Sequence, residues 1–209
     1  MTPAAHKHLS KRDPVMRRLI REHGQCDLAP EKRPPFQSLV MAVAHQQLNG
    51  MAANTILTRF KKLFPGRKFP RPEDLANVTD EQIRACGFSF AKIKSIRDIA
   101  EKALSGVIPS SRQIVELPDD EIVARLMEVR GVGRWTVEML LIFQLERADV
   151  LPADDFGVRS GFRIAYKQRE MPTVKELLAF GEKWKPHRTT AAWFLWCAAD
   201  AAKTTKKKK

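Results

Sequence analysis

The sequence has few of the features that hold together disulfide-bonded, metal-bound or membrane-embedded proteins. Its 209 residues include three cysteines, Cys26, Cys86 and Cys197, which are far apart and form no Cys-x-x-Cys pair. Such a set argues against a disulfide framework, a zinc site and an iron–sulfur cluster. The longest uncharged apolar run, Thr189 to Ala199, is too short to cross a bilayer, and the N-terminus shows no signal-peptide pattern. We therefore expect a soluble, cytoplasmic protein without a membrane partner.

The sequence also has fewer acidic than basic residues, and it lacks the residue patterns of β-strands. Lysine and arginine number 37 against 24 aspartates and glutamates, which gives a net charge of +13. This excess favours a polyanionic partner, namely DNA, RNA or an anionic membrane. The basic tail at residues 203–209 is either a solvated end or a non-specific tether to phosphate. No stretch alternates polar and apolar residues with β-branched enrichment, so we predict an all-α fold.

What the chain does have is helical periodicity. Apolar residues recur at spacings of three and four along most of it, which predicts roughly ten helices. Residues 1–13 are polar and are expected to be frayed. Residues 36–64 should form one long helix, or two with a break near Asn49-Gly50. Two capping boxes, at Thr79–Gln82 and Thr173–Glu176, predict where two further helices begin.

The most informative segment is a pair of glycines between two helical patterns. Gly131 and Gly133 allow a tight turn and a close backbone approach. A helix beginning at such a turn presents unpaired backbone N–H groups, which bind an anion without a side chain. An acidic pair, Asp154-Asp155, follows, and Asp155 lies 20 positions after Trp135 (155 − 135). A carboxylate at that spacing could face whatever carries the anion.

This combination resembles the helix-hairpin-helix DNA glycosylases, and more closely the 3-methyladenine DNA glycosylase II branch of alkylation repair. Three further segments support the resemblance: 39–49, 86–92 and 184–196. Relatives that also cut the DNA backbone carry a lysine nucleophile where this chain has Trp135. The resemblance therefore implies a monofunctional glycosylase. The alternatives are a bifunctional glycosylase-lyase for other damaged bases and a non-catalytic helix-hairpin-helix module that only grips DNA.

The resemblance also implies an architecture and a reaction. We expect a single domain over residues 1–209 with two helical lobes and the active site in the cleft between them. Lobe 1 should comprise about 14–48 plus 136–202, and lobe 2 about 50–135, followed by the tail. The monomeric enzyme should flip alkylated, cationic methylpurine-type bases out of double-stranded DNA and excise them hydrolytically. It should require no cofactor and hold no iron–sulfur cluster.

Asp155 is the implied catalytic residue. Cleavage of an N-glycosidic bond builds positive charge on the sugar, which a carboxylate can stabilise while it orients or deprotonates water. An acidic pair before a helix is, on its own, usually a pair of helix caps. The hairpin and the spacing favour a division of roles, with Asp154 as N-cap or structural residue and Asp155 as catalyst.

Two tryptophans and a methionine are the candidates for the base pocket: Trp135, Met139 and Trp196. A cationic base prefers an electron-rich ring face, an interaction worth about 0.5–2 kcal/mol. The alternative is core packing, the usual role of tryptophan. Packing is the expectation for Trp184 and Trp193.

Two segments are candidates for contact with DNA. The hairpin should meet phosphate through backbone N–H groups and charge, and the polar 45–47 segment should lie at the DNA, with Gln47 or Leu48 filling the gap left by a flipped nucleotide. The alternative for that segment is a satisfied helix-end network. The candidate residues are Gln46, Gln47, Leu48, Gly131, Gly133, Arg134 and Thr136. The resemblance further implies that the carbonyls of Met127, Val129 and Gly131 hold a monovalent cation.

Overall fold

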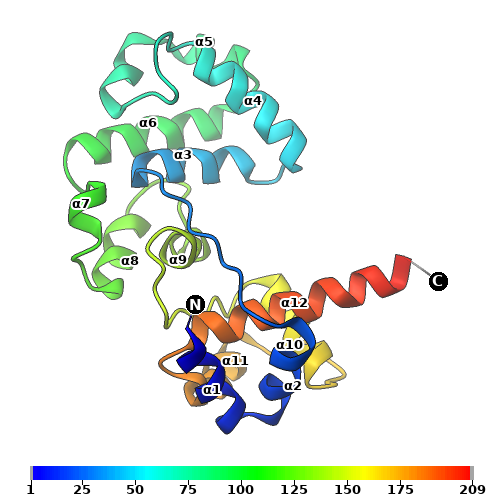
Figure 1. Ribbon diagram of the computed structural model, residues 1–209. Helices are drawn as coiled ribbons and strands as arrows, with labels where there is room; N and C mark the ends of the chain where they lie inside the picture. The colour runs from blue at the N-terminus through cyan, green and yellow to red at the C-terminus, as the bar shows by residue number, and fades with distance from the viewer. Residues whose placement is uncertain (1, 208–209) are drawn as a thin grey trace. The chain divides into compact units, whose positions relative to one another are not determined.

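The computed structural model describes residues 2–207, and within that range it contains helices and no strand. The prediction of an all-α fold is confirmed. The chain divides into two compact units, of which unit 1 is Met1–Glu31 with Leu141–Lys209 and unit 2 is Lys32–Leu140 (Figure 1). Each unit has its own core and is described by itself.

Unit 1 combines both ends of the chain. Its helices are α1 (Pro3–Arg12), α2 (Pro14–His23), α10 (Phe156–Ala165), α11 (Val174–Gly181), the 3-10 helix η2 (Glu182–Trp184) and α12 (Arg188–Lys207). The principal contact is between α10 and α12, and α2 also packs on α12. Fully buried large side chains, including Trp184 and Phe194, fill the core. Trp184 therefore packs as predicted, and Trp193 lies half-buried against the same cluster.

A buried carboxylate organises the N-terminal part of unit 1. Asp13 is 1% exposed and caps α2 through the N–H groups of the first turn. Its other oxygen accepts from the Tyr166 hydroxyl at 2.6 Å and from the Trp184 indole at 3.0 Å, and pairs with the Lys183 ammonium at 3.0 Å. Burial alone would raise the pKa of Asp13, but these hydrogen bonds and the lysine charge together lower it. Asp13 is thus an ionised structural residue with several donors.

Unit 2 is built around one central helix. Its elements are α3 (Pro35–His45), α4 (Gly50–Lys62), the 3-10 helix η1 (Pro72–Asn77), α5 (Asp80–Ala85), α6 (Phe90–Leu104), α7 (Ser111–Ile114), α8 (Asp119–Met127) and the greater part of α9 (Arg134–Phe143). Helix α6 contacts α3, α5 and η1, and Figure 1 shows it running alongside α3. Its apolar positions, Ile93, Ile96 and Ile99, are fully buried at helical spacing.

Local sequence signals predicted several helix ends. Both predicted capping boxes are present, with Thr79 opening α5 and Thr173 opening α11. The break near Asn49-Gly50 is also present, because α3 ends at His45 and Asn49 caps α4. The prediction of a frayed N-terminus was wrong, since α1 is a helix whose Leu9 is fully buried. The prediction failed because the apolar face of α1 consists of only two residues, Ala5 and Leu9, in an otherwise polar segment.

The two units have different boundaries from the predicted lobes. Residues 32–48 were expected in lobe 1, but they belong to unit 2 because α3 packs on α6 and α4. The boundary on the other side falls inside α9, after Leu140, rather than at residue 135. Helix α12 continues through residues 203–207 of the basic tail, and Lys208 and Lys209 lie outside the described residues.

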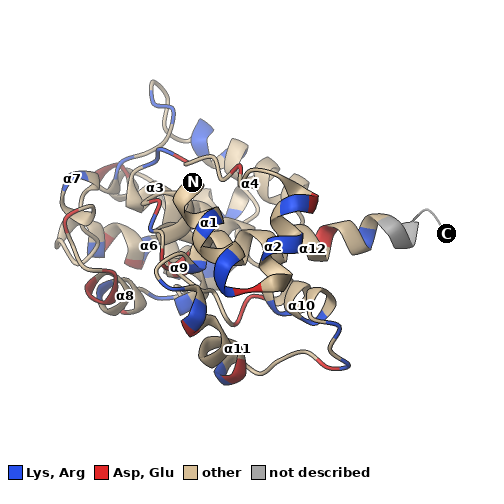
Figure 2. Cartoon of the chain, turned by 60° about the horizontal axis from the view of Figure 1, so that its bottom comes forward, with Lys and Arg blue, Asp and Glu red and all other residues tan. Residues whose placement is uncertain are grey.

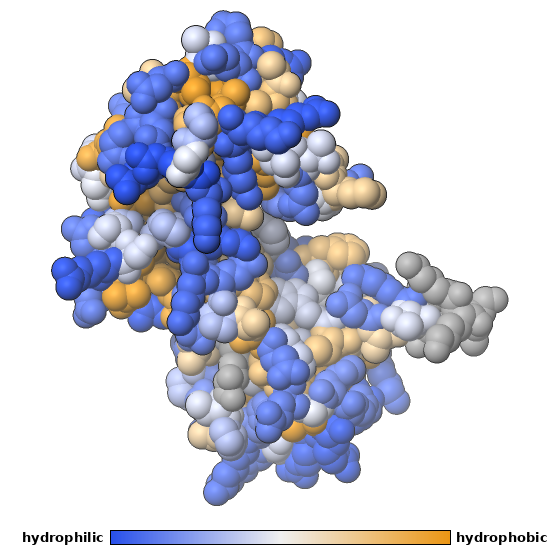
Figure 3. All heavy atoms as spheres, turned by 45° about the horizontal axis from the view of Figure 1, so that its top comes forward, coloured by the Kyte–Doolittle hydropathy of each residue, from blue (hydrophilic) through white to orange (hydrophobic). Residues whose placement is uncertain are grey.

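The surface is rich in charge. Figure 2 shows lysine and arginine on both units, with acidic residues interspersed. The face drawn in Figure 3 is largely hydrophilic, with apolar side chains in separate areas. Among the residues that the structure describes, no helix combines the length and apolar character needed to span a membrane.

Candidate active site and DNA-contacting elements

In unit 1, Asp155 is held by two hydrogen bonds to the same oxygen. Its Oδ1 accepts the backbone N–H of Val158 at 2.8 Å and the indole N–H of Trp196 at 2.7 Å. The first bond makes Asp155 the N-cap of α10, and the second connects α10 to α12. The side chain is half-buried. The carboxylate is therefore fixed in orientation at a helix N-terminus, where the helix dipole favours negative charge.

This geometry corrects the predicted division of roles within the acidic pair. Asp154 was expected to be the N-cap or a structural residue, but the capping residue is Asp155, and Asp154 is exposed. Capping and catalysis are compatible, since the cap uses one carboxylate oxygen. The identity of the cap matters for any substitution, because removing the Asp155 side chain would also remove a helix cap.

Two glycines one turn apart bring α10 close to α12. A Cβ added at Gly161 would lie 1.9 Å from the Leu195 carbonyl oxygen, so no side chain fits there. A Cβ at Gly157 would lie 2.8 Å from Trp196 Cδ1 and 3.0 Å from Asp155 Oδ1. The small residues thus permit the approach that allows Trp196 to reach Asp155. Gly157 and Gly161 belong to no sequence motif, and only their spacing of four could have indicated a close helix contact.

Trp196 has a second aromatic contact in unit 1. Its ring stacks on Phe143 with centroids 5.9 Å apart and planes at 24°. The side chain is only partly buried. The carboxylate of Asp155 and the ring of Phe143 together fix the orientation of the Trp196 indole. A residue that lines a base pocket, as predicted for Trp196, needs such a fixed orientation. The hydrogen bond to Asp155 is an additional feature that no local sequence pattern indicates.

In unit 2, Trp135 and Met139 lie on one face of α9. They are four residues apart, so their side chains are neighbours on the helix. Trp135 is 47% exposed, although it is large and apolar, and Met139 is partly buried. This exposure is not that of a core residue, which weakens the packing alternative for Trp135.

The turn after α3 lies against the hairpin. Gln46 and Gln47 follow the end of α3 rather than lying within it, and Gln47 has a left-handed backbone with φ of 58°. The Gln46 side-chain amide donates to the Gly131 carbonyl at 2.8 Å. Gln47 and Leu48 are exposed. The turn therefore presents Gln47 and Leu48 outward, while Gln46 points to its own chain.

Glycine occupies the two hairpin positions, 131 and 133, for different physical reasons. Gly131 has a φ of 78°, and a Cβ there would lie 2.6 Å from Ser95 Oγ, so both conformation and space require glycine. A Cβ at Gly133 would meet no protein atom within 4 Å. Nothing in the described residues therefore demands glycine at Gly133. Open space there suits the close approach of an external backbone.

The structure places two of the predicted hairpin contacts, Thr136 and Arg134, differently. Thr136 is buried, and its backbone N–H donates to the Gly133 carbonyl at 2.9 Å, so it is not placed to meet DNA. Arg134 is exposed, and its guanidinium pairs with Glu138 at 3.1 Å. Its position at the first turn of α9 leaves it a candidate for phosphate contact.

The predicted cation site contains carbonyls that already accept hydrogen bonds. The Val129 carbonyl accepts from the Val132 N–H at 3.0 Å, and the Gly131 carbonyl accepts from Gln46. A carbonyl oxygen has two lone pairs, so these bonds are compatible with a further ligand. Carbonyl oxygens at a helix end suit a hard monovalent ion. The cation remains a prediction.

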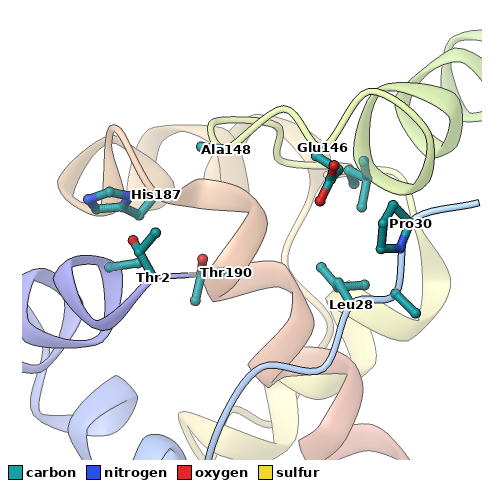
Figure 4. A pocket seen from close by; sticks show the side chains of 10 residues that line it. Thr2, Leu28, Pro30, Glu146, Ala148, His187 and Thr190 are labelled. Atoms are coloured by element: carbon teal, nitrogen blue, oxygen red, sulfur yellow. The ribbon is translucent and has the colours of Figure 1, made fainter.

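Unit 1 also contains a cavity of about 290 Å³. It is lined by residues at the start of α1, in the segment before unit 2, at the end of α9 and just after it, and at the start of α12, including Thr2, Leu28, Glu146 and His187 (Figure 4). Asp155 and Trp196 are not among its lining residues. This cavity is therefore separate from the candidate catalytic carboxylate.

Comparison with known proteins identifies the family. The sequence profile described as "HhH-GPD superfamily base excision DNA repair protein" matches residues 40–187. The chain is 43% identical over 204 residues to DNA-3-methyladenine glycosylase 1 of Schizosaccharomyces pombe, covering 97% of this chain and 90% of that protein. It is 34% identical over 194 residues to alkylbase DNA glycosidase-like protein mag2 of the same yeast, covering 92% and 91%.

Comparison with solved structures gives the same family. The 3-methyladenine DNA glycosylase of Schizosaccharomyces pombe, in complex with abasic DNA, matches with a TM-score of 0.82 at 44% identity, over 92% of this chain and 95% of that chain. A DNA-3-methyladenine glycosidase from Bacillus halodurans matches with a TM-score of 0.86 at 33% identity, over 95% and 89%. With a profile match over more than half of its length and relatives of this identity and coverage, the chain belongs to the HhH-GPD superfamily of base excision DNA repair proteins.

Proposed function

We propose that this protein is a monofunctional DNA glycosylase that hydrolytically excises alkylated, cationic methylpurine-type bases from double-stranded DNA. The observation that carries the proposal is the oriented Asp155 carboxylate, held by Val158 and Trp196 in a chain with this family membership. The relatives named for 3-methyladenine support the substrate class. The location of the active site in a cleft remains a prediction.

Asp155 supplies charge to the reaction. As the glycosidic bond breaks, the sugar develops oxocarbenium character, and a preorganised carboxylate stabilises it. The same group can orient or deprotonate the attacking water. An N3- or N7-methylated purine already carries positive charge, so it leaves without protonation by a second acid. A single positioned carboxylate therefore suffices for this substrate class.

Trp135, Met139 and Trp196 are the proposed base-contacting residues. Trp135 offers an exposed indole face in unit 2, and Trp196 offers a stacked indole in unit 1. A cationic base gains from such faces through a cation–π interaction of about 0.5–2 kcal/mol. The proposed DNA contacts are Gln47, Leu48, Gly131, Gly133 and Arg134. The Gln46 side chain instead donates to the Gly131 carbonyl within the protein.

Trp135 distinguishes this proposal from a glycosylase-lyase. A lyase of this family needs an amine to form a Schiff base with the opened sugar, and an indole cannot do so. The protein should therefore leave intact abasic sites and should not be trapped on DNA by borohydride. A borohydride-trapped adduct of the wild-type protein would establish the bifunctional alternative.

The direct test is a base-release panel. Duplex DNA bearing single alkylated or deaminated bases is incubated with the protein, and released bases are separated by chromatography. Alkali then cleaves any abasic sites. We expect release of N3-methyladenine and N7-methylguanine and strand breaks only after alkali. Binding without release of any base would favour the non-catalytic module.

The protein acts as a cytoplasmic monomer and requires no cofactor. A monovalent cation held by the carbonyls of Met127, Val129 and Gly131 would stiffen the hairpin against DNA phosphate. Replacement of potassium by a bulky organic cation at constant ionic strength tests this by weakened DNA binding.

A further inference from the structure

One face of α6 binds the backbone of two segments far apart in the sequence. Lys92, Ser95, Asp98 and Lys102 follow one another at spacings of three or four, so they share a side of the helix. Each contacts either the turn after α3 or the hairpin that precedes α9. The stripe is polar, although it lies beside the buried apolar positions Ile93, Ile96 and Ile99 of the same helix.

Lys92 holds the turn. Its ammonium donates to the Ala44 carbonyl at 2.9 Å and to the Gln46 carbonyl at 2.7 Å, at the C-terminal end of α3. A cation at this position satisfies carbonyls that have no partner within the helix. Burial lowers the pKa of Lys92, as expected for an ammonium taken partly out of water.

The other members of the stripe hold the hairpin. Asp98 Oδ2 accepts the Arg130 N–H at 2.7 Å, and Lys102 donates to the Glu128 carbonyl at the end of α8. Ser95 packs against Gly131 so closely that a Cβ would clash. The carbonyl of the same Gly131 accepts from Gln46. Gln46 thus joins the turn to the hairpin directly, while α6 supports both.

We propose that Lys92 and Gln46 are positioning residues that couple the Gln46–Leu48 turn and the hairpin into one rigid DNA-contacting element. This inference rests on the proposed function, in which both segments meet DNA. Rigid coupling fixes the distance between the phosphate-gripping hairpin and the side chain that fills the gap of the flipped nucleotide. The cost of ordering these segments is then met during folding rather than during base flipping.

Hydrogen exchange of the free protein tests the coupling. The Leu48 amide donates to His45 within the turn, and the Arg130 and Val132 amides are hydrogen-bonded within or beside the hairpin. Lys92→Met removes the ammonium but keeps the length of the chain. We expect exchange of all three amides to accelerate about tenfold or more, the loss typical of a charge-assisted bond. Acceleration confined to Leu48 would overturn the proposal, because Lys92 touches no hairpin residue.

Two further variants keep the test decisive. Lys94→Met removes the same charge from an exposed position of α6 and should leave all three exchange rates unchanged. If Lys92→Met does not fold, Gln46→Met provides the readout, since it removes only the link to Gly131. Faster exchange at Val132 supports coupling, and unchanged exchange there overturns it.

Single-turnover excision at saturating DNA gives an independent readout. Lys92→Met should slow the step roughly tenfold, as misplacement by an ångström or less can do. Lys94→Met should weaken binding but not slow this step. Equal effects of the two variants, confined to affinity, would show Lys92 to be a simple phosphate charge. The exchange experiment contains no DNA, so it remains informative if the proposed function fails, and loss of excision in Asp155→Asn tests that function separately.

Discussion

The candidate chemistry of unit 1 and the candidate DNA grip of unit 2 are built in opposite ways. In unit 1, two side chains 41 positions apart, Asp155 and Trp196, bond to each other across helices that glycine brings close. In unit 2, the turn and the hairpin form the exposed elements, and side chains of α6 hydrogen-bond to their backbone groups. A reacting carboxylate must be aimed at one atom, whereas a phosphate backbone is met by several amides. Catalysis therefore needs a rigid side chain, and contact with phosphate needs a rigid main chain.

The strongest test of the unit 1 assignment is Asp155→Asn. Asparagine is nearly isosteric and can accept from Val158 and Trp196 in the same way, so the cap of α10 should survive. The charge facing the developing oxocarbenium disappears, and single-turnover excision should fall by about 10²–10³-fold with DNA affinity retained. Asp154→Asn is the matched control, with excision near that of the wild type. Near-normal excision by Asp155→Asn would remove the carboxylate from the mechanism.

A second aspartate of unit 1, Asp13, should matter for stability rather than for chemistry. Asp13→Ala removes a helix cap and leaves the buried Trp184 N–H without its acceptor, which should lower the free energy of unfolding by about 3 kcal/mol. Urea denaturation measures this. The variant, where folded, should excise bases at the wild-type rate. A selective loss of excision without destabilisation would contradict a scaffold role.

The same residue predicts a pH dependence. The pKa of Asp13 is lowered in the folded protein, so its contribution is complete above the ordinary aspartate pKa of about 3.9 and is lost as pH falls through the folded value. Wild-type stability should therefore fall more steeply than that of Asp13→Ala in this acid range. Parallel acid-unfolding curves would show that Asp13 does not carry the effect.

Trp196→Phe tests whether the indole orients the catalyst. Phenylalanine keeps a ring beside Phe143 but cannot donate to Asp155, and excision should slow roughly tenfold at saturating DNA. Trp193→Phe on the same helix is the control and should change little. In an Asp155→Asn background the effect of Trp196→Phe should largely vanish, because a residue that acts through Asp155 has nothing left to orient. Fully additive losses would leave Trp196 only a base-contacting role.

The smallest expected effect concerns the basic tail. Deletion of Lys206 to Lys209 should weaken DNA binding a few-fold and flatten the dependence of log K on log salt, because fewer counterions are released. Excision at saturation should be unchanged. Titration by fluorescence anisotropy over a range of salt concentrations measures the slope. An altered base preference would show that the tail is more than a tether.

Sequence patterns predicted those features that depend on neighbouring residues. The capping boxes at Thr79 and Thr173, the break at Asn49-Gly50 and the all-α class follow from local hydrogen bonding and periodicity. The glycine hairpin and the acidic pair were visible for the same reason. The resemblance then supplied the family and the choice of Asp155, which periodicity alone does not contain.

Tertiary structure decided what depends on contacts between distant residues. The donor to Asp155 from residue 196, the clamp of Lys92 on residues 44 and 46, and the place of α3 in unit 2 all join positions that local patterns treat separately. The N-cap of α10 is Asp155 rather than Asp154, because the chain turns at Pro152 and directs the second carboxylate to the helix. The sequence by itself determined the helices and their caps, since these form within a few residues. Only packing decided which side chains meet, because burial and approach depend on the whole core.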